Sequence, residues 1–279
     1  MRILIRSVAQ NKFFRKHFSA IIFLLLAAFV AYALFKPKKD PFHKNTVWPI
    51  KAITRGDSTK KTIALVFTAH DFGDGLSLIA ATLRLKQINA SFFLTGDFYR
   101  NEIASRLISE LKRDGNYLGS HSDKHLLYCD WTNRDSLLVT KQEFTDDLLN
   151  SYRELKNFGV EKNSARYFLP PYEWYNDSIT SWAAQLGLQL VNFTPGTRST
   201  ADYTYPDMGS KYMSNEMIYQ SIIKLEKNSP SGLNGFILLI HAGTDPRRKE
   251  KFYYQLPSLI DDLKRLSYSF VTIDQLLEK

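Results

Sequence analysis

Two histidines four residues apart, His121 and His125 in the stretch LGSHSDKHLLYCDW, are the first candidates for chemistry. On a helix, side chains at this spacing lie on one face and can share a metal ion. A His-x-x-x-His pair also arises often by chance, so the pair alone is a weak indication of a metal site.

A second segment, VFTAHDFGDG (66–75), places His70, Asp71 and Asp74 in a glycine-containing loop. One Asp with two His gives three protein ligands and leaves a position for water, which is typical of a catalytic zinc site. Asp71 is the candidate third ligand, because Asp74 precedes an apolar helical pattern and is suited to cap that helix. We expect zinc from the ligand types, although cobalt, nickel or manganese also suits such a site.

A further histidine, His241, follows the apolar segment FILLI. It is either a satisfied core histidine or a general acid, since the ordinary pKa of imidazole lies near neutrality. Its place at the end of a predicted strand favours the general acid.

These residues follow apolar segments that alternate with helical patterns from Thr62 onward. Strands are predicted over 62–68, 90–95, 116–120, 166–169, 188–194, 235–242 and 268–273. Helices are predicted over 76–88, 101–113, 140–157, 176–186, 214–228 and 252–266. The alternation predicts an α/β fold with a parallel sheet, and both an open doubly wound sheet and a (β/α) barrel fit it. In a barrel the chemistry lies at the carboxyl ends of the strands, which is where the histidines occur.

The formal charge of +9 is concentrated near the N-terminus, where residues 1–44 hold nine of the 37 basic residues and one of the 28 acidic ones. The rest of the chain is close to neutral, so we expect no nucleic-acid partner. The uncharged run 19–35 is long enough to span a bilayer, and the basic residues before it predict an exported C-terminal part. A cleaved signal peptide is the alternative, because Ala31-Tyr32-Ala33 fits a cleavage site.

The expected organisation is a basic cytoplasmic segment (1–18), a transmembrane anchor (19–35), a linker (36–61) and one catalytic domain (62–279). Cys129 is the only cysteine, which excludes an intramolecular disulfide and a cysteine-based zinc site. The sequence indicates no protein partner.

Taken together, the motifs resemble the polysaccharide deacetylases of the NodB-homology type, a family of carbohydrate esterases. The segments TAHD, HSDKH, LPPYEW, TPGTRSTADY and LLIHAG follow the family's order of motifs between about residues 62 and 245. The resemblance implies a distorted (β/α) barrel of seven or eight strands and one divalent metal ion, often zinc. It also implies hydrolysis of an acetamido or acetyl ester group on a glycan.

The resemblance also implies roles for single residues. It implies metal ligation by Asp71, His121 and His125, a general acid at His241 tuned by Asp202, and an oxyanion contact from the backbone N–H of Tyr172.

Two departures from the family pattern concern the general base. His70 stands where the family has an aspartate base, and Leu169 stands where it has an arginine that holds this base. An arginine beside a histidine base would lower its pKa, so the two changes suit each other and His70 is the first candidate for the base. Asp74 and Glu173 are alternatives. Loss of the base, which would leave a membrane-tethered glycan-binding pseudoenzyme, is a further alternative.

Candidate substrate contacts are Glu173, Trp174, Tyr203 and Arg198. Other aromatic residues near the motifs either stack on sugar rings or pack within the protein. A glycosidase using Asp71 and Glu173 is a rival, but it leaves the histidine motifs without a role. The expected substrate is an extracytoplasmic polysaccharide, which the sequence does not name.

Overall fold

The computed structural model describes residues 51–278, whose centre is one parallel sheet of seven strands. The strands are β1 (Thr62–Ala69), β2 (Ser91–Leu94), β3 (Tyr117–Ser120), β4 (Tyr167–Phe168), β5 (Gln189–Leu190), β6 (Phe236–His241) and β7 (Ser269–Phe270). Their order is β5-β4-β3-β2-β1-β6, and β7 pairs with the start of β1. The predicted α/β fold with a parallel sheet is therefore confirmed.

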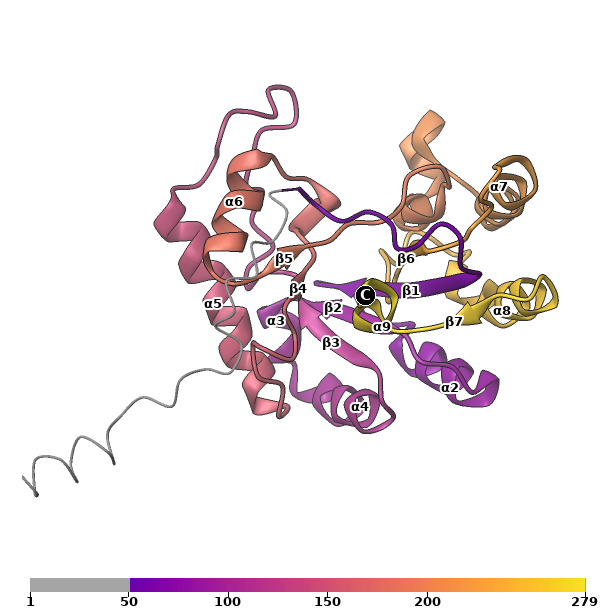
Figure 1. The fold of residues 1–279 in the computed structure, drawn as a ribbon, viewed down its shortest axis with the longest axis horizontal. Coiled ribbons are helices and arrows are strands. Elements are labelled where there is room, and N and C mark those ends of the chain that lie inside the picture. The colour runs from indigo at the N-terminus through magenta and orange to yellow at the C-terminus, as the bar shows by residue number, and fades with distance from the viewer. Residues whose placement is uncertain (1–50, 279) are drawn as a thin grey trace, which may run out of the picture. The chain divides into compact units, whose positions relative to one another are not determined.

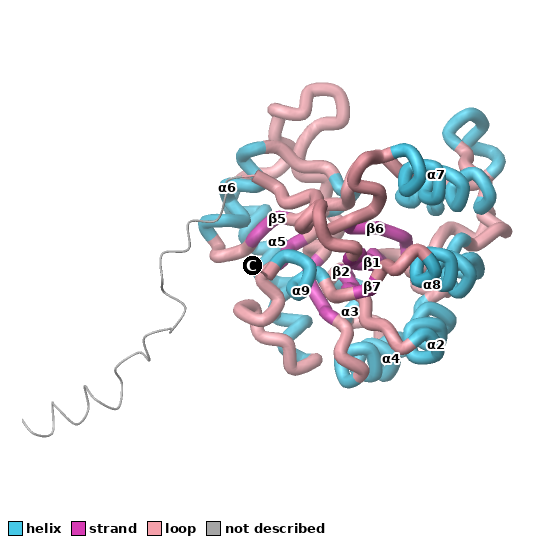
Figure 2. Tube along the Cα trace, turned by 45° about the vertical axis from the view of Figure 1, so that its right-hand side comes forward, coloured by secondary structure: helices cyan, strands magenta, loops and turns pink. Residues whose placement is uncertain are grey.

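Helices surround the strands, as Figures 1 and 2 show. The longer ones are α2 (Leu76–Lys86), α4 (Glu102–Arg113), α5 (Lys141–Asn157), α6 (Asp177–Gln185), α7 (Asn215–Asn228) and α8 (Leu256–Arg265). Burial of β1 and β6 on both faces explains why these strands are continuous apolar runs without alternation. A capping box begins α5, with the Thr140 hydroxyl accepting from the N–H of Glu143 at 3.2 Å.

Every strand and helix predicted from Thr62 onward has a counterpart, but the boundaries differ. The predicted strand 188–194 shortens to Gln189–Leu190. The predicted helix 252–266 divides into the 3₁₀ turn η4 (Phe252–Gln255) and α8, whose first turn contains Pro257. Proline lacks an N–H and is suited to the first turn of a helix, so the α-helix begins there. Two short helices, α3 (Gly96–Tyr99) and α9 (Ile273–Leu277), were not predicted because they are too short to show a helical period.

The two ends of the sheet are joined by the segment before β1. Ile53 exchanges backbone hydrogen bonds with Leu190 and Asn192 beside β5, and the N–H of Gly56 donates to Gly235 before β6 at 2.7 Å. The strands thereby wrap toward a distorted barrel. Residues 51–61 belong to this domain, so the prediction that the linker extends to residue 61 is wrong.

The predicted basic segment 1–18, the predicted membrane anchor 19–35 and most of the predicted linker lie outside the described residues. Within residues 51–278 there is no helix both long and apolar enough to cross a membrane.

Candidate active site

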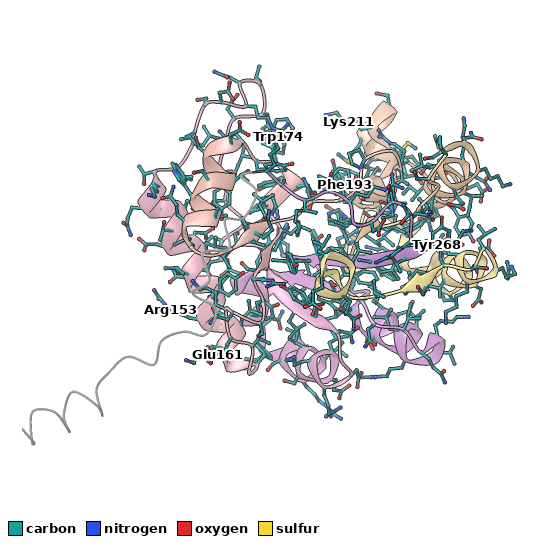
Figure 3. All side chains as sticks on the ribbon, viewed as in Figure 1. Arg153, Glu161, Trp174, Phe193, Lys211 and Tyr268 are labelled. Atoms are coloured by element: carbon teal, nitrogen blue, oxygen red, sulfur yellow. The ribbon has the colours of Figure 1, made fainter. Side chains whose placement is uncertain are left out.

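A cleft of about 940 Å³ opens at the carboxyl ends of the strands. Most of the predicted site residues line it: His70, Asp71, His121, His125, Tyr172, Glu173, Trp174, Tyr203 and His241. Figure 3 labels two residues of its wall, Trp174 and Phe193. The sheet thus brings together side chains that follow β1, β3, β4 and β6, as expected for parallel strands that end at one edge.

His121 and His125 meet through a loop, so the helical interpretation of their spacing is wrong. The loop follows β3, and two of its residues, Ser122 and His125, adopt left-handed backbone angles with φ of 73° and 55°. The Ser122 hydroxyl accepts a hydrogen bond from the N–H of His125 at 2.9 Å. This tight turn brings the second imidazole over the first.

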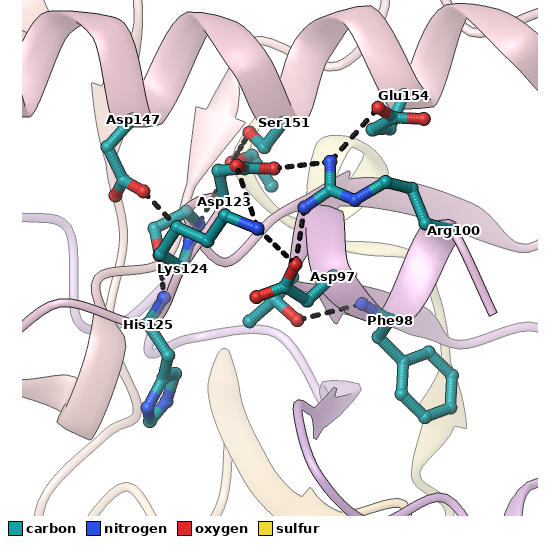
Figure 4. Close-up of polar contacts among 12 residues, drawn as sticks. Asp97, Phe98, Arg100, Asp123, Lys124, His125, Asp147, Ser151 and Glu154 are labelled. Atoms are coloured by element: carbon teal, nitrogen blue, oxygen red, sulfur yellow. Dashed lines mark hydrogen bonds and ion pairs between the residues drawn. The ribbon is translucent and has the colours of Figure 1, made fainter.

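Charged residues anchor the middle of the same loop, as Figure 4 shows. Asp123 is buried and forms an ion pair with Arg100 at 2.8 Å. The N–H of Lys124 donates to one oxygen of Asp147 at 2.8 Å, and the Tyr128 hydroxyl donates to the other at 2.6 Å. Removing one partner of a buried ion pair is strongly destabilising. Asp123 and Lys124 therefore fix the backbone that carries the two histidines.

The two histidines fit a metal ion in both geometry and charge. Their Nε2 atoms lie 3.2 Å apart, close to the ~3.3 Å that two nitrogen ligands of a tetrahedral zinc ion would have. Burial, together with the neighbouring histidines, lowers the pKa of His121 to about 3 and that of His125 to about 2. Both rings are therefore neutral. The Nδ1–H of His121 donates to the Leu169 carbonyl at 2.9 Å, which leaves the Nε2 lone pair toward the cleft.

The predicted third ligand, Asp71, does not complete this site in the structure. Its side chain is 72% exposed and lies 3.4 Å from the Nε2 of His70. Among residues 51–278, no three His, Cys, Asp or Glu side chains are arranged to hold an ion. The histidine pair fits a metal ion, whereas the Asp71 side chain would have to turn inward to bind the same ion.

His70 is engaged through both ring nitrogens. Its Nδ1 lies 3.2 Å from the Thr95 hydroxyl, and its Nε2 faces Asp71. The ring also stacks on His125 with centroids 4.6 Å apart. His70 therefore packs against the histidine pair at the wall of the cleft.

His241 is held by Asp202, which lies in the 3₁₀ turn η2 (Ser199–Tyr203). One carboxylate oxygen of Asp202 accepts from the backbone N–H of His241 at 2.8 Å, and the other accepts from its Nδ1 at 2.6 Å. Burial alone would lower the pKa of His241, but the charge and hydrogen bond of Asp202, with a contribution from Glu173, raise it to about 9. The imidazole is therefore protonated at neutral pH, with its Nε2 side toward the cleft.

The turn after β4, η1 (Pro171–Glu173), carries an unusual backbone. Tyr172 and Glu173 are consecutive non-glycine residues in the left-handed region, with φ of 58° and 55°. Such residues are disfavoured and concentrate at functional sites. The turn brings the Tyr172 ring within 4.3 Å of the His125 ring, measured between centroids.

An aromatic wall, formed by Trp131, Tyr172 and Trp174, borders the cleft. The Trp131 ring lies 5.5 Å from each of the other two rings, and its side chain is about half exposed. The guanidinium of Arg134 covers the Trp174 ring at 3.9 Å, and the Trp174 indole N–H donates to the Asp130 carbonyl at 3.1 Å. An exposed, rigid aromatic face of this kind suits a sugar ring.

Two predicted roles do not agree with the structure. Asp74 does not cap α2, whose N-cap is Gly75 without a side-chain bond. The Asp74 carboxylate instead accepts from the Thr244 N–H at 3.0 Å and the Tyr253 hydroxyl at 2.7 Å, so it braces the β1 and β6 loops and is not free to act as a base. Arg198 is exposed and does not line the cleft, so the structure does not support it as a substrate contact.

Sequence reasoning missed Thr95, Arg134 and the Leu169 carbonyl. Thr95 and Arg134 have no motif of their own, and their partners His70 and Trp174 are distant in sequence. The Leu169 carbonyl is a backbone group, so its role cannot be predicted from the type of residue.

The model of the family described as "Polysaccharide deacetylase" matches residues 55–191 of the chain. Residues 55–191 are a polysaccharide deacetylase domain. The match begins just before β1 and ends after β5, so it includes the histidine pair and η1. The resemblance seen in the motifs is confirmed, and with it the assignment to a family of hydrolases.

Proteins similar to this chain include two from Bacillus. The uncharacterized protein YlxY of Bacillus subtilis is 23% identical over 88% of this chain, which spans 66% of YlxY, just under two thirds. A peptidoglycan-N-acetylglucosamine deacetylase of Bacillus cereus is 23% identical over 79% of this chain and 90% of its own length. A solved pseudoenzyme of carbohydrate esterase family 4 from Bacillus anthracis has a TM-score of 0.64 at 20% identity, covering 82% of this chain and 70% of that one. This last similarity shows a shared fold.

Proposed function

We propose that this polysaccharide deacetylase is a metal-dependent hydrolase that acts on an extracytoplasmic polysaccharide. It removes acetyl groups from amides, and the same site suits acetyl esters. The observation that carries the proposal is one cleft containing two neutral, converging histidines and a protonated histidine held by a buried carboxylate. His121 and His125 suit a cation, and His241 with Asp202 suits proton donation. Metal-assisted acyl hydrolysis requires both.

The ion, for which zinc is our choice, would be held by His121, His125 and, once turned inward, Asp71. When bound it would polarise the acetyl carbonyl and favour ionisation of a water. His241 donates a proton to the leaving nitrogen or oxygen, and Asp202 keeps its ring oriented for that transfer. The backbone N–H of Tyr172 is our candidate for stabilising the negative charge that develops on the carbonyl oxygen.

The aromatic wall and Tyr203 would bind the sugar next to the acetyl group. Tyr203 is about half exposed, and its ring meets His241 edge-on at 5.7 Å between centroids. A sugar stacked on Tyr203 would lie beside the proton donor. The name of the Bacillus cereus relative makes N-acetylglucosamine in peptidoglycan the first substrate to test.

We also propose that the domain acts outside the cytoplasm, attached by residues 19–35. The support is the uncharged run with five basic residues before it. Alkaline phosphatase fused after residue 44 in a bacterium should be active if the proposal holds. An inactive fusion, with an active fluorescent-protein fusion at the same place, would contradict it.

The activity test is acetate release by the full chain, loaded with zinc, from N-acetylglucosamine oligomers, peptidoglycan and acetylated xylan. We expect release that a chelator stops and added metal restores. The competing function is glycan binding without catalysis, which the histidine at position 70 and the leucine at position 169 favour. That function predicts bound oligomer with no acetate.

A further inference from the structure

Glu173 is a cleft carboxylate without a partner. Its side chain lines the cleft, yet it makes no hydrogen bond or ion pair with any of residues 51–278. Its backbone, by contrast, is fixed: its N–H donates to Pro170 at 3.1 Å, and its carbonyl accepts from the Asn192 amide at 2.8 Å. A half-buried acid in a cleft normally finds a partner, so a free one is poised for a ligand.

Given the proposed function, we propose that Glu173, and not His70, accepts the proton of the water that attacks the acetyl carbonyl. The other candidates are engaged. The Nδ1 of His70 is tied to the Thr95 hydroxyl at 3.2 Å, and its ring is stacked on the candidate ligand His125 with centroids 4.6 Å apart. Asp74 is held by Thr244, Tyr253 and Lys251 at the base of its own loop.

The backbone supports the same assignment. The left-handed conformation at Glu173 favours glycine, which would fit this turn without strain. The chain places a long acidic side chain there instead, next to a second left-handed residue. A strained residue directed into a cleft is better explained by what its side chain does there than by folding.

The electrostatic surroundings suit proton transfer. Removal from water raises the pKa of Glu173 to about 7, although the charge of His241 opposes this rise and that of Asp202 adds to it. His241 has a pKa of about 9 and faces Asp202 and Glu173, while His121 and His125 nearby stay neutral. Between these two pKa values Glu173 is ionised and His241 is protonated, so one accepts and the other donates.

The proton balance closes between the two residues. Glu173 takes one proton of the water while the oxygen of the water bonds to the carbonyl carbon. The π electron pair of the carbonyl moves onto the carbonyl oxygen. When the carbon–nitrogen bond breaks, its electron pair leaves on nitrogen, which takes a proton from Nε2 of His241. Transfer of the proton from Glu173 to His241 restores both groups, and the products are the amine and acetic acid.

The test compares Glu173→Gln, Glu173→Gly and His70→Gln in the zinc-loaded full chain. Glu161→Gln is the matched control, because Glu161 is exposed and lies well apart from Trp174 in Figure 3. Glu173→Gln should lower kcat by about 100-fold or more with little change in KM. It should also remove the acidic limb of the kcat/KM profile at pH about 7. Glu173→Gly should lose the same activity with an equal or higher Tm.

A readout independent of turnover is the pKa of His241, followed by NMR. It should fall in Glu173→Gln, because Glu173 helps to raise it. A kcat within about threefold of wild type in Glu173→Gln, loss of the acidic limb in His70→Gln instead, or an unchanged His241 pKa would each overturn the assignment. A wild-type chain that releases no acetate from any acetylated glycan would refute the proposed function, and this inference with it, before any variant is compared.

Discussion

At physiological pH His241 is protonated in the wild type. Replacing Asp202 by Asn should make it a mostly neutral imidazole. The substitution keeps the shape of the side chain but removes the charge that opposes desolvation. The pKa of His241 rises from 6.5 to about 9 in the folded protein, which corresponds to about 3 kcal/mol in favour of the protonated form. Without Asp202, burial dominates and the pKa should fall to 6.5 or lower.

The consequence for catalysis follows from the protonated fraction. At pH 7.5, a pKa of 6.5 leaves only about a tenth of His241 protonated, compared with nearly all of it in the wild type. We therefore expect acetate release to fall by at least about tenfold, and further because the ring loses its orientation.

The same change alters the pH dependence of stability. Because the folded pKa of His241 is raised, its contribution is fully present below pH 6.5 and is lost as the pH rises through about 9. Between these two pH values the free energy of unfolding of the wild type should fall by about 3 kcal/mol through this group, and in Asp202→Asn this decrease should be absent. Histidine NMR and urea unfolding at pH 6 and pH 9 would measure both effects. An unchanged His241 pKa near 9 in the variant would refute the reasoning.

Three further predictions concern other parts of the site. The His121→Ala, His125→Ala double variant should lose the one bound ion per chain measured in the wild type by elemental analysis; retained ion would contradict the ligand assignment. Trp131→Ala should raise KM for long oligomers about tenfold with kcat preserved, unless the aromatic wall does not bind sugar. Gly96→Ala should lower the free energy of unfolding by about 3 kcal/mol, because its Cβ would overlap the Asp123 carboxylate that anchors the histidine loop. An unchanged free energy of unfolding would show that Asp123 moves aside without cost.

The periodic parts of the sequence predicted the sheet well. Continuous apolar runs such as Thr62–Ala69 and Phe236–His241 can only be buried strands at that length, and the residues after them had to meet at one edge. The meeting of His70, His121, Tyr172 and His241 in one cleft was therefore accessible from the sequence.

What the sequence could not predict depends on backbone conformation and on distant partners. The loop between His121 and His125 is made by left-handed angles at Ser122 and His125, which spacing alone does not indicate. Asp74 was expected to cap a helix, but its partners Thr244 and Tyr253 lie far along the chain. The segment around Ile53 looked like a polar tether because its role, joining β5 to β6, uses backbone hydrogen bonds.

Metal-dependent deacetylation is tested most directly by acetate release from N-acetylglucosamine oligomers by the zinc-loaded full chain, measured beside the His121→Ala, His125→Ala variant. We expect release by the wild type and none by the variant. Release by the wild type should stop with a chelator and recover with added zinc. An ion-loaded wild-type chain that binds the oligomers but releases no acetate from them, from peptidoglycan or from acetylated xylan would contradict it.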